Sequence, residues 1–290
     1  MWWRRAREQL IETLIRLSGF SAIAIVVLIF VFLLKEGVAL FRTVPLDEFL
    51  TGQRWYPISE PPGFGVFPLI CGSLLVTIGA AMLSVPLGIA SALFISEIAK
   101  GWMKELLKAG IELFAAIPSV VLGFIGMTLL APFIRQAFHV PTGLTALTGS
   151  ITLAFMAMPT IVSITEDALT AVPRGYREAA IALGATRWQM MVRVLLPAAG
   201  SGIVAAVMLG IGRVIGETMA VMMVTGNAAV IPHTMLQPVR TLTATIAAEM
   251  GETVRGSDHY FALFAIGIVL FVITFVVNLI ADRFLHREQR

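Results

Sequence analysis

Long apolar stretches separated by short polar segments constrain this chain more than any other feature. A helix needs about 20 mostly apolar residues to cross the hydrocarbon core of a bilayer, and a helix satisfies its own backbone hydrogen bonds there. We therefore expect an all-α membrane protein in which residues 1–290 form a single transmembrane domain. The apolar stretches predict about six spans, at approximately residues 14–34, 67–95, 111–133, 144–164, 198–225 and 261–280.

The composition excludes a soluble enzyme or a nucleic-acid-binding protein. Charged residues make up 13% of the chain and hydrophobic residues 58%, whereas a soluble domain carries about 25% charged residues. The net charge is +3. The basic residues are divided among short loops rather than gathered on one face, so we expect contact with membrane lipid and no binding of nucleic acid.

Lysine and arginine placement predicts the orientation in the membrane. Basic residues concentrate before the first stretch, in the link after the second, in segment 166–197 and in the C-terminal tail 282–290. By the positive-inside rule these segments are cytoplasmic, which places both termini inside. The arginine-rich N-terminus also resembles a secretory signal. However, the apolar stretch is followed directly by the charged Lys35 and Glu36, which favours an uncleaved first span.

Segment 166–197 predicts a pair of short helices on the cytoplasmic side. Pro173 suits the start of a helix, and Gly184 suits the left-handed turn that ends it. Thr186 can then cap a second helix that carries Trp188. A basic amphipathic helix on anionic lipid is the alternative interpretation.

The same segment carries a family resemblance. Glu178-Ala179-Ala180 is followed after three residues by Gly184 and after nine more by Val194-Leu195-Leu196-Pro197. This spacing resembles the EAA loop of ABC importer permeases, and implies their small, MetI-like bundle. In that family the loop docks into the ATP-binding subunit. The residues to which the resemblance assigns this coupling, by close approach, turn formation or charge pairing, are Arg177, Glu178, Ala179, Ala180, Gly184 and Arg187.

The chain lacks the elements of a nucleotide site and of a hydrolase. It contains no G-x-x-x-x-G-K-[ST] sequence, so ATP and magnesium must be bound by a separate subunit. We find neither H-E-x-x-H nor G-x-S-x-G, and the histidines are scattered. The expectation is therefore a chain with no catalytic residue, no metal site and no cofactor of its own.

A charged pair lies within the fifth predicted span. Arg213 costs about 2.5–3.5 kcal/mol at the centre of a span, so it should face protein or water. Glu217 lies four residues later, on the same face of a continuous helix, where it can pair with Arg213. A guanidinium matches tetrahedral oxyanions. A carboxylate beside it would favour phosphate, which keeps a proton near neutral pH, over sulfate.

Two further side chains are candidates for the substrate path. Thr218 follows the charged pair, and Ser119 follows Pro118 within the third predicted span. A hydroxyl on the path and a simple helix kink are both compatible with the Pro118-Ser119 pair. Arg213 and Glu217 can likewise be a structural ion pair that fixes helix packing.

A more specific resemblance covers most of the chain. Gly212-Arg213-Val214-Ile215-Gly216-Glu217-Thr218-Met219-Ala220-Val221 is similar to a run of the phosphate-specific (Pst) permeases, and so is Ala116–Val121. Leu50–Pro57 resembles a region of their C-type (PstC) subunit. The resemblance implies a bacterial-type plasma (inner) membrane and a path in which Arg213 and Glu217 take part. It also implies three kinds of partner: an A-type permease subunit, a dimer of ATP-binding subunits and an extracytoplasmic phosphate-binding protein.

Other functions remain compatible with parts of the sequence. An importer permease for sulfate, molybdate or phosphonate would share the same loop. A secondary transporter or channel could use Arg213 and Glu217 as an ion or proton relay, but it leaves the Glu-Ala-Ala-Gly spacing unexplained. A scaffold without transport activity leaves the charges within the span unexplained.

Overall fold

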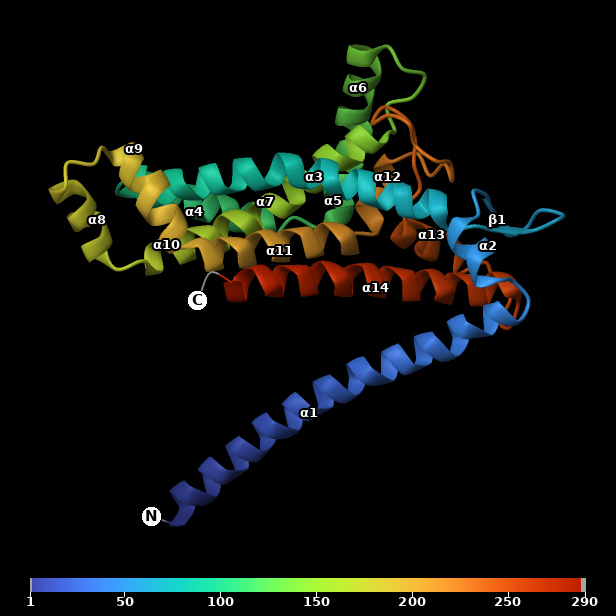
Figure 1. The fold of residues 1–290 in the computed structure, drawn as a ribbon, viewed down its shortest axis with the longest axis horizontal. Helices are drawn as coiled ribbons and strands as arrows, with labels where there is room; N and C mark the ends of the chain where they lie inside the picture. Colours follow the sequence, from blue (N-terminus) through green and yellow to red (C-terminus); the bar gives the residue numbers. More distant parts are fainter. Residues whose placement is uncertain (1, 288–290) are drawn as a thin grey trace.

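The computed structural model describes residues 2–287 and is almost entirely helical (Figure 1). The only strands among these residues form a two-stranded antiparallel hairpin in which Trp55 pairs with Phe64. The elements are α1 (Trp2–Val38), η1 (Ala39–Arg42), α2 (Leu46–Thr51), β1 (Trp55–Tyr56), β2 (Gly63–Phe64), α3 (Phe67–Leu93), η2 (Phe94–Ile98), α4 (Trp102–Ala115), α5 (Ser119–Ile125), η3 (Gly126–Leu130), α6 (Ala131–Phe138), α7 (Ala146–Ala171), α8 (Arg174–Ala182), α9 (Arg187–Met190), η4 (Met191–Leu195), α10 (Leu196–Ala198), α11 (Gly200–Gly216), α12 (Met219–Val224), α13 (Leu242–Glu249) and α14 (Asp258–Arg287).

The expected all-α membrane fold is confirmed. Five helical segments in the described part of the chain are long and apolar enough to cross a membrane. The number is six if a bent pair of segments, residues 187–198 and 200–216 with an angle of 74° between them, is counted as one span. Part of the predicted tail, residues 288–290, lies outside the described residues, as do the side chains of Arg4 and Arg5.

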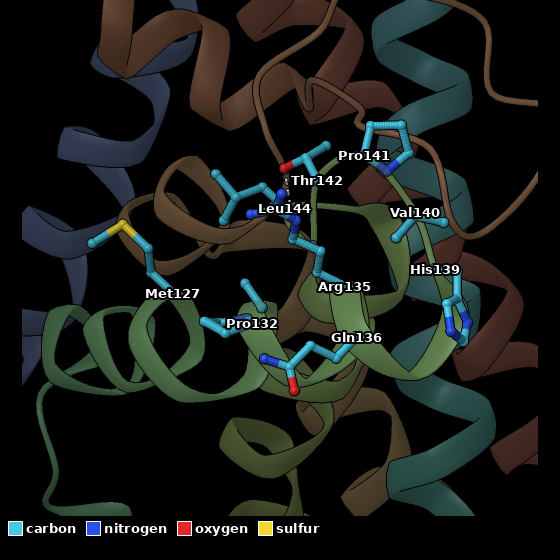
Figure 2. Close-up of a pocket in the computed structure, with 11 residues that line it drawn as sticks. Met127, Pro132, Arg135, Gln136, His139, Val140, Pro141, Thr142 and Leu144 are labelled. Atoms are coloured by element: carbon cyan, nitrogen blue, oxygen red, sulfur yellow. Dashed lines mark hydrogen bonds between the residues drawn. The ribbon is translucent and has the colours of Figure 1, made fainter.

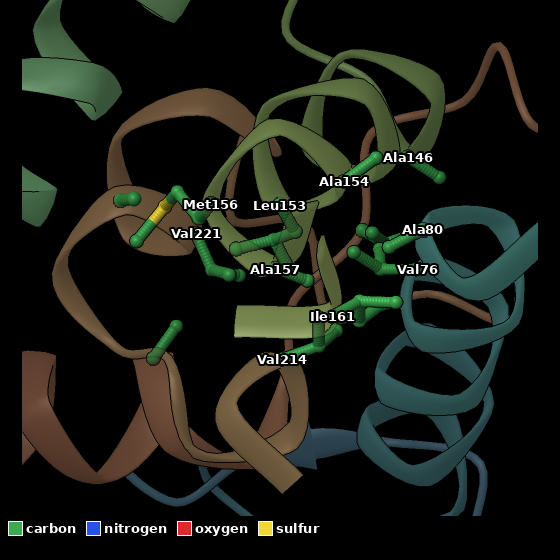
Figure 3. Close-up of a cluster of buried hydrophobic side chains, with 13 residues drawn as sticks. Val76, Ala80, Ala146, Leu153, Ala154, Met156, Ala157, Ile161, Val214 and Val221 are labelled. Atoms are coloured by element: carbon green, nitrogen blue, oxygen red, sulfur yellow. The ribbon is translucent and has the colours of Figure 1, made fainter. Parts of the chain in front are cut away.

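Helix α7 forms the centre of the bundle. It packs closely against α3 and α11, where glycines remove the side chain that would hold the helices apart. Gly88 of α3 and Gly210 of α11 both lie against Ile161 of α7, and a Cβ at either position would come within 2.7 Å of that side chain. Figure 3 shows the apolar cluster at this junction, which draws Val76 and Ala80 from α3 and three alanines together with Leu153, Met156 and Ile161 from α7.

The third span begins later than the sequence predicts. Residues 111–115 belong to α4, the chain leaves the helical path near Pro118, and α5 starts at Ser119. Together α5, η3 and α6 form a span over Ser119–Phe138, instead of 111–133. The physical reason is Pro118, which disfavours helical geometry in the residue before it and separates the amphipathic α4 from the apolar span.

The fifth span is not the continuous helix expected over 198–225. Helix α11 ends at Gly216, Glu217 is extended, and a second short helix, α12, begins at Met219. A contact from outside the span stabilises the break: the hydroxyl of Thr243 in α13 donates to the Glu217 carbonyl over 2.8 Å. That carbonyl therefore has a partner without the next turn of a helix.

A polar cluster holds the end of the bundle where α2, the β-hairpin and α13 meet (Figure 1). Glu249 accepts hydrogen bonds from the Trp55 indole and forms an ion pair with Arg240 over 2.6 Å. The His259 ring lies 2.8 Å from the same carboxylate, at the start of α14. These contacts join three polypeptide segments that are separate in the sequence.

Candidate functional site

Arg213 is an exposed cation in the membrane-spanning part of the described chain. It projects from α11, and its Nη1 donates to the hydroxyl of Thr160, 3.3 Å away, near the middle of α7. Because Thr160 lies well inside a helix that is long enough to cross the bilayer, this contact places the guanidinium far from both ends of α7. Most of its donors remain free to bind an oxyanion.

The expected ion pair between Arg213 and Glu217 is wrong for this structure. Among the described residues no salt bridge joins the two side chains. The helix breaks between them, so the four-residue spacing no longer puts them on one helix face. Glu217 instead caps the next helix, where its Oε1 accepts a hydrogen bond from the Ala220 backbone N–H at 3.1 Å. A carboxylate is stabilised at the start of a helix.

Ser119 and Thr218 mark the starts of two short helices that lie side by side. Ser119 is the first residue of α5, and the Thr218 hydroxyl donates to the Gly216 carbonyl immediately before α12. Gly123 approaches Ala220 so closely that an added Cβ would lie 2.9 Å from its Cα. The structure therefore brings α5 and α12 together. The break before Ser119 and the break at Glu217 thus precede two helices that pack against each other.

A pocket in the described part of the chain lies elsewhere (Figure 2). It has a volume of about 680 Å³ and is lined by η3, α6 and the loop that leads to α7, including Arg135 and His139. None of the four predicted path residues lines it. Arg213 lies on an exposed face of the single chain, as expected if the path forms between this chain and a second one.

The helix pair predicted within segment 166–197 is formed. Gly184 has φ +83° and ends α8, with Ala185 N–H donating to the Ala180 carbonyl, which is the left-handed helix end that glycine favours. Thr186 caps α9 and exchanges hydrogen bonds with Gln189 in a capping box. The turn between the helices projects beyond the bundle (Figure 1).

This turn presents both apolar and charged groups. Leu183 is 89% exposed and Trp188 is 67% exposed. Large exposed apolar side chains at a protruding turn are typical of a protein-binding surface. Glu178, Ala179 and Arg187 are also exposed, whereas Ala180 faces inward and is buried. We refer to α8, the turn and α9, residues 174–190, as the docking segment.

The contacts of Arg177 differ from the prediction, which was that this residue pairs with charged groups on a partner subunit. Its guanidinium forms a 2.7 Å ion pair with Glu97 in η2, at the end of the second span. It also donates to the backbone carbonyls of Leu169 and Val172, at the C-terminal end of α7. All of these partners lie within the chain, so Arg177 belongs to the interior support of the docking segment rather than to its outer surface.

Sequence reasoning missed a second charged cluster near the docking segment. Glu166 is 2% exposed and lies within 3.0 Å of Lys104 and 2.6 Å of Lys108, both on α4. The hydrogen bond with Glu166 raises the pKa of Lys108 above its usual value. The available signal was the four-residue spacing of the two lysines, which places them on one helix face. Their buried partner is 58 or more residues away in the sequence, beyond any local pattern.

Comparison with known protein families gives a match over residues 84–290. The matching model is that of the binding-protein-dependent transport system inner membrane component. Two curated relatives are similar over most of the chain. The probable ABC transporter permease protein YqgH of Bacillus subtilis is 45% identical over 260 residues, which are 89% of this chain and 84% of the relative. The phosphate transport system permease protein PstC of Mesorhizobium japonicum is 38% identical over 259 residues, which are 83% of this chain and 78% of the relative.

A solved structure supports the same fold. A chain of the MetNI methionine ABC transporter in an inward-facing conformation superposes with a TM-score of 0.61, covering 80% of this chain and all of the other. The two sequences are 20% identical. At that identity the likeness concerns the bundle, and the identity of the solute must come from the site.

Proposed function

This chain belongs to the family of binding-protein-dependent transport system inner membrane components, and from that membership we propose that it is the membrane-spanning permease subunit of an ATP-driven phosphate importer. It is a multi-pass protein of the inner membrane. Relatives named as phosphate transport permeases are 38% and 32% identical over 83% and 84% of the chain. The sequence contains no phosphate-cradling loop for a nucleotide, so the chain contributes the path and leaves ATP hydrolysis to another subunit.

Arg213 is the observation that carries this function. An unpaired arginine on a span is costly in lipid and is retained where it faces a path. Its guanidinium fork binds phosphate oxygens well, and only one of its donors is used by Thr160. The anion therefore meets one fixed positive charge midway across the membrane. Thr218 and Ser119 supply hydroxyl groups near the adjoining helix breaks.

The proposed partners are those that the family resemblance implies, and two surfaces of the chain support them. A dimer of ATP-binding subunits, which holds ATP and magnesium, docks on the segment that carries Glu178, Ala179 and Arg187. A binding protein delivers phosphate at the opposite side of the membrane. An A-type permease completes the path opposite Arg213, because the guanidinium is exposed in the single chain. In this arrangement both termini are cytoplasmic.

Alternating access describes how these parts would act together. ATP-driven closure of the partner subunits moves the docking segment, and the spans rock around the Arg213 region. The site must attract phosphate strongly enough for entry and weakly enough for release. One arginine with a neutral hydroxyl partner satisfies this requirement better than a cluster of cations would.

The experiment measures transport in vesicles by a complex reconstituted from this chain, the A-type permease, the ATP-binding subunits and the phosphate-binding protein. We expect ATP-dependent phosphate uptake, and uptake should fall at least about tenfold in Arg213→Gln, since a charged hydrogen bond contributes about 1.5–3 kcal/mol. Arg213→Lys should retain part of the activity, because it keeps the charge and loses the planar fork.

Arg16→Gln is the matched control, since Arg16 forms only an exposed ion pair with Glu12 on α1. Its uptake should equal that of the unmodified protein. Preferential uptake of sulfate or molybdate would favour the other oxyanion permeases. Anion flux that persists without the ATP-binding subunits would contradict the importer function and favour a secondary transporter.

A further inference from the structure

The Arg177 side chain joins the docking segment to the ends of two membrane spans. We propose that Arg177 is a positioning residue that locks α8 to the cytoplasmic ends of α3 and α7, so that the three move as one body when the ATP-binding subunits close. The inference rests on the proposed function. It adds a linkage within this chain to the contacts that the docking segment makes with the ATP-binding subunits.

The geometry of this linkage is specific. Nε and Nη2 of Arg177 both donate to the Glu97 carboxylate, with a shortest distance of 2.7 Å. Nη1 donates to the Val172 carbonyl over 2.8 Å, and Nη2 donates to the Leu169 carbonyl over 2.9 Å. The Ser96 hydroxyl orients Glu97 with a further hydrogen bond of 3.1 Å. One guanidinium on α8 thus contacts both η2 and the C-terminal end of α7.

The contacts to α7 are made to carbonyls at its C-terminal end, where the Leu169 carbonyl also accepts the Val172 backbone N–H. The last carbonyls of an α-helix have no intrahelical donor and carry partial negative charge. A cation at this position is favourable, and the fork geometry of arginine reaches two carbonyls and one carboxylate together. Arg177 is 21% exposed and Glu97 is 10% exposed, so the pair is screened only weakly by water.

Helix α8 itself buries little apolar surface. The helix has nine residues, and helices shorter than about 12 residues are marginal in isolation. Its only buried residue is Ala180, whose single methyl group packs in the cluster that includes Ile95 and Leu169. Ala180 can contribute only a small hydrophobic term, about 0.8 kcal/mol for one buried carbon. The charged hydrogen bonds of Arg177 therefore add substantially to the contacts that α8 makes with η4 and α9.

The two spans that Arg177 joins lead to the proposed path. Helix α7 carries Thr160, the hydrogen-bond partner of Arg213, and α3 packs along α7 through Gly79 and Gly88. Displacement of α8 is thereby transmitted to the helix that contacts Arg213. A docking segment without this link could bind the ATP-binding subunit and still fail to move the spans.

The first test measures hydrogen exchange on the full complex and needs no transported solute. Arg177→Gln should accelerate amide exchange in peptides covering residues 174–183 by about tenfold or more, as expected for loss of charged hydrogen bonds. Arg193→Gln is the matched control, since its exposed side chain has no hydrogen-bond or ion-pair partner among the described residues. It should leave exchange in α8 unchanged.

The second test measures phosphate imported per ATP hydrolysed. Arg177→Gln and Glu97→Gln should each lower this ratio at least about fivefold, the lower range of typical coupling energies, while the ATP-binding subunit still co-purifies. The double variant should be no worse than Arg177→Gln alone, because both changes break one interaction. Arg177→Lys, which keeps the charge, should fall between them and the unmodified protein.

Unchanged amide exchange in α8 of Arg177→Gln would overturn the linkage. Faster exchange with an unchanged ratio of phosphate imported to ATP hydrolysed would overturn the role of the linkage in moving the spans. Additive losses in the double variant would likewise contradict a shared interaction. If Arg177→Gln does not fold, Glu97→Gln and Arg177→Lys decide the matter. Failure of the unmodified complex to import phosphate concerns the proposed function only, because the exchange experiment stands without it.

Discussion

Arg213 leaves most of its hydrogen-bond donors free, since its one partner among the described residues is the hydroxyl of Thr160. The carboxylate of Glu217 lies at the start of α12, where the Ala220 N–H binds it. A neutral contact leaves the full positive charge of Arg213 for an anion. The negative charge of Glu217 remains on the adjoining helix break, where it can act on the choice of anion.

Glu217→Gln should lower the preference for phosphate over sulfate. The amide oxygen of glutamine can still accept the Ala220 N–H, so the start of α12 should be preserved. Loss of the carboxylate removes an acceptor for the proton of hydrogen phosphate and a charge that repels sulfate. We expect the uptake ratio to fall roughly fivefold, equivalent to about 1 kcal/mol. Competition uptake in vesicles measures it.

Glu252→Gln is the control for that experiment, because Glu252 is exposed in the loop between α13 and α14. Its uptake ratio should match that of the unmodified protein. An unaltered phosphate-to-sulfate ratio in Glu217→Gln would remove Glu217 from selectivity and leave it as a helix cap.

At the scale of elements, the docking segment depends on one left-handed residue. Gly184 has φ +83° with open space around it, so any penalty for a side chain there comes from the backbone conformation alone. Gly184→Ala should cost about 1–2 kcal/mol locally. We expect a weaker attachment of the ATP-binding subunit, measured by co-purification from detergent, and a lower temperature of unfolding.

Gly175→Ala provides the opposite case on the same helix. Gly175 also has open space but lies in the first turn of α8 with ordinary helical geometry. Alanine there should stabilise α8 by up to about 1 kcal/mol. Weaker attachment with both substitutions would indicate that the surface itself, rather than the turn, is sensitive to added methyl groups.

Two clusters of charged side chains next to the docking segment also act at the scale of elements. Glu166 binds two lysines of α4, and Arg177 binds Glu97 and the end of α7. The pKa of Lys108 is raised by its contact with Glu166. The stabilisation from this contact is therefore fully present at pH values below the ordinary lysine pKa, and it is lost as the pH rises through the higher pKa of the folded state. This contribution is therefore constant across the physiological range.

For the whole molecule, the orientation across the membrane can be tested with single cysteines. The chain has one cysteine, Cys71, so Cys71→Ser gives a background without thiols. Ile58 is 85% exposed in the hairpin region, and Leu183 is 89% exposed in the docking segment. A membrane-impermeant thiol reagent should label Ile58→Cys in right-side-out vesicles and Leu183→Cys only in inside-out vesicles.

Binding of the ATP-binding subunit should then protect Leu183→Cys from the reagent, while Ile58→Cys remains accessible. Labelling of Leu183→Cys from the outside would reverse the proposed orientation. It would also exclude docking of a cytoplasmic ATP-binding subunit on this segment.

The sequence predicted the features that depend on neighbours along the chain. Apolar length indicated the spans, because the thickness of the bilayer sets the number of residues per helix. Gly184 and Thr186 indicated the turn between α8 and α9, because a positive φ and a cap are local requirements. The family resemblance was also carried by fixed spacings, and the family match agrees with it.

Only the tertiary structure decided which charges meet. Thr243 stabilises the break at Glu217, and Thr160 rather than Glu217 binds Arg213. Arg177 is bound by Glu97, which lies 80 residues earlier, and so turns inward instead of toward a partner. A buried charge without a partner is costly, so buried charged groups must find partners wherever the packed helices bring them. That arrangement is a property of the folded bundle, which no local pattern in the chain contains.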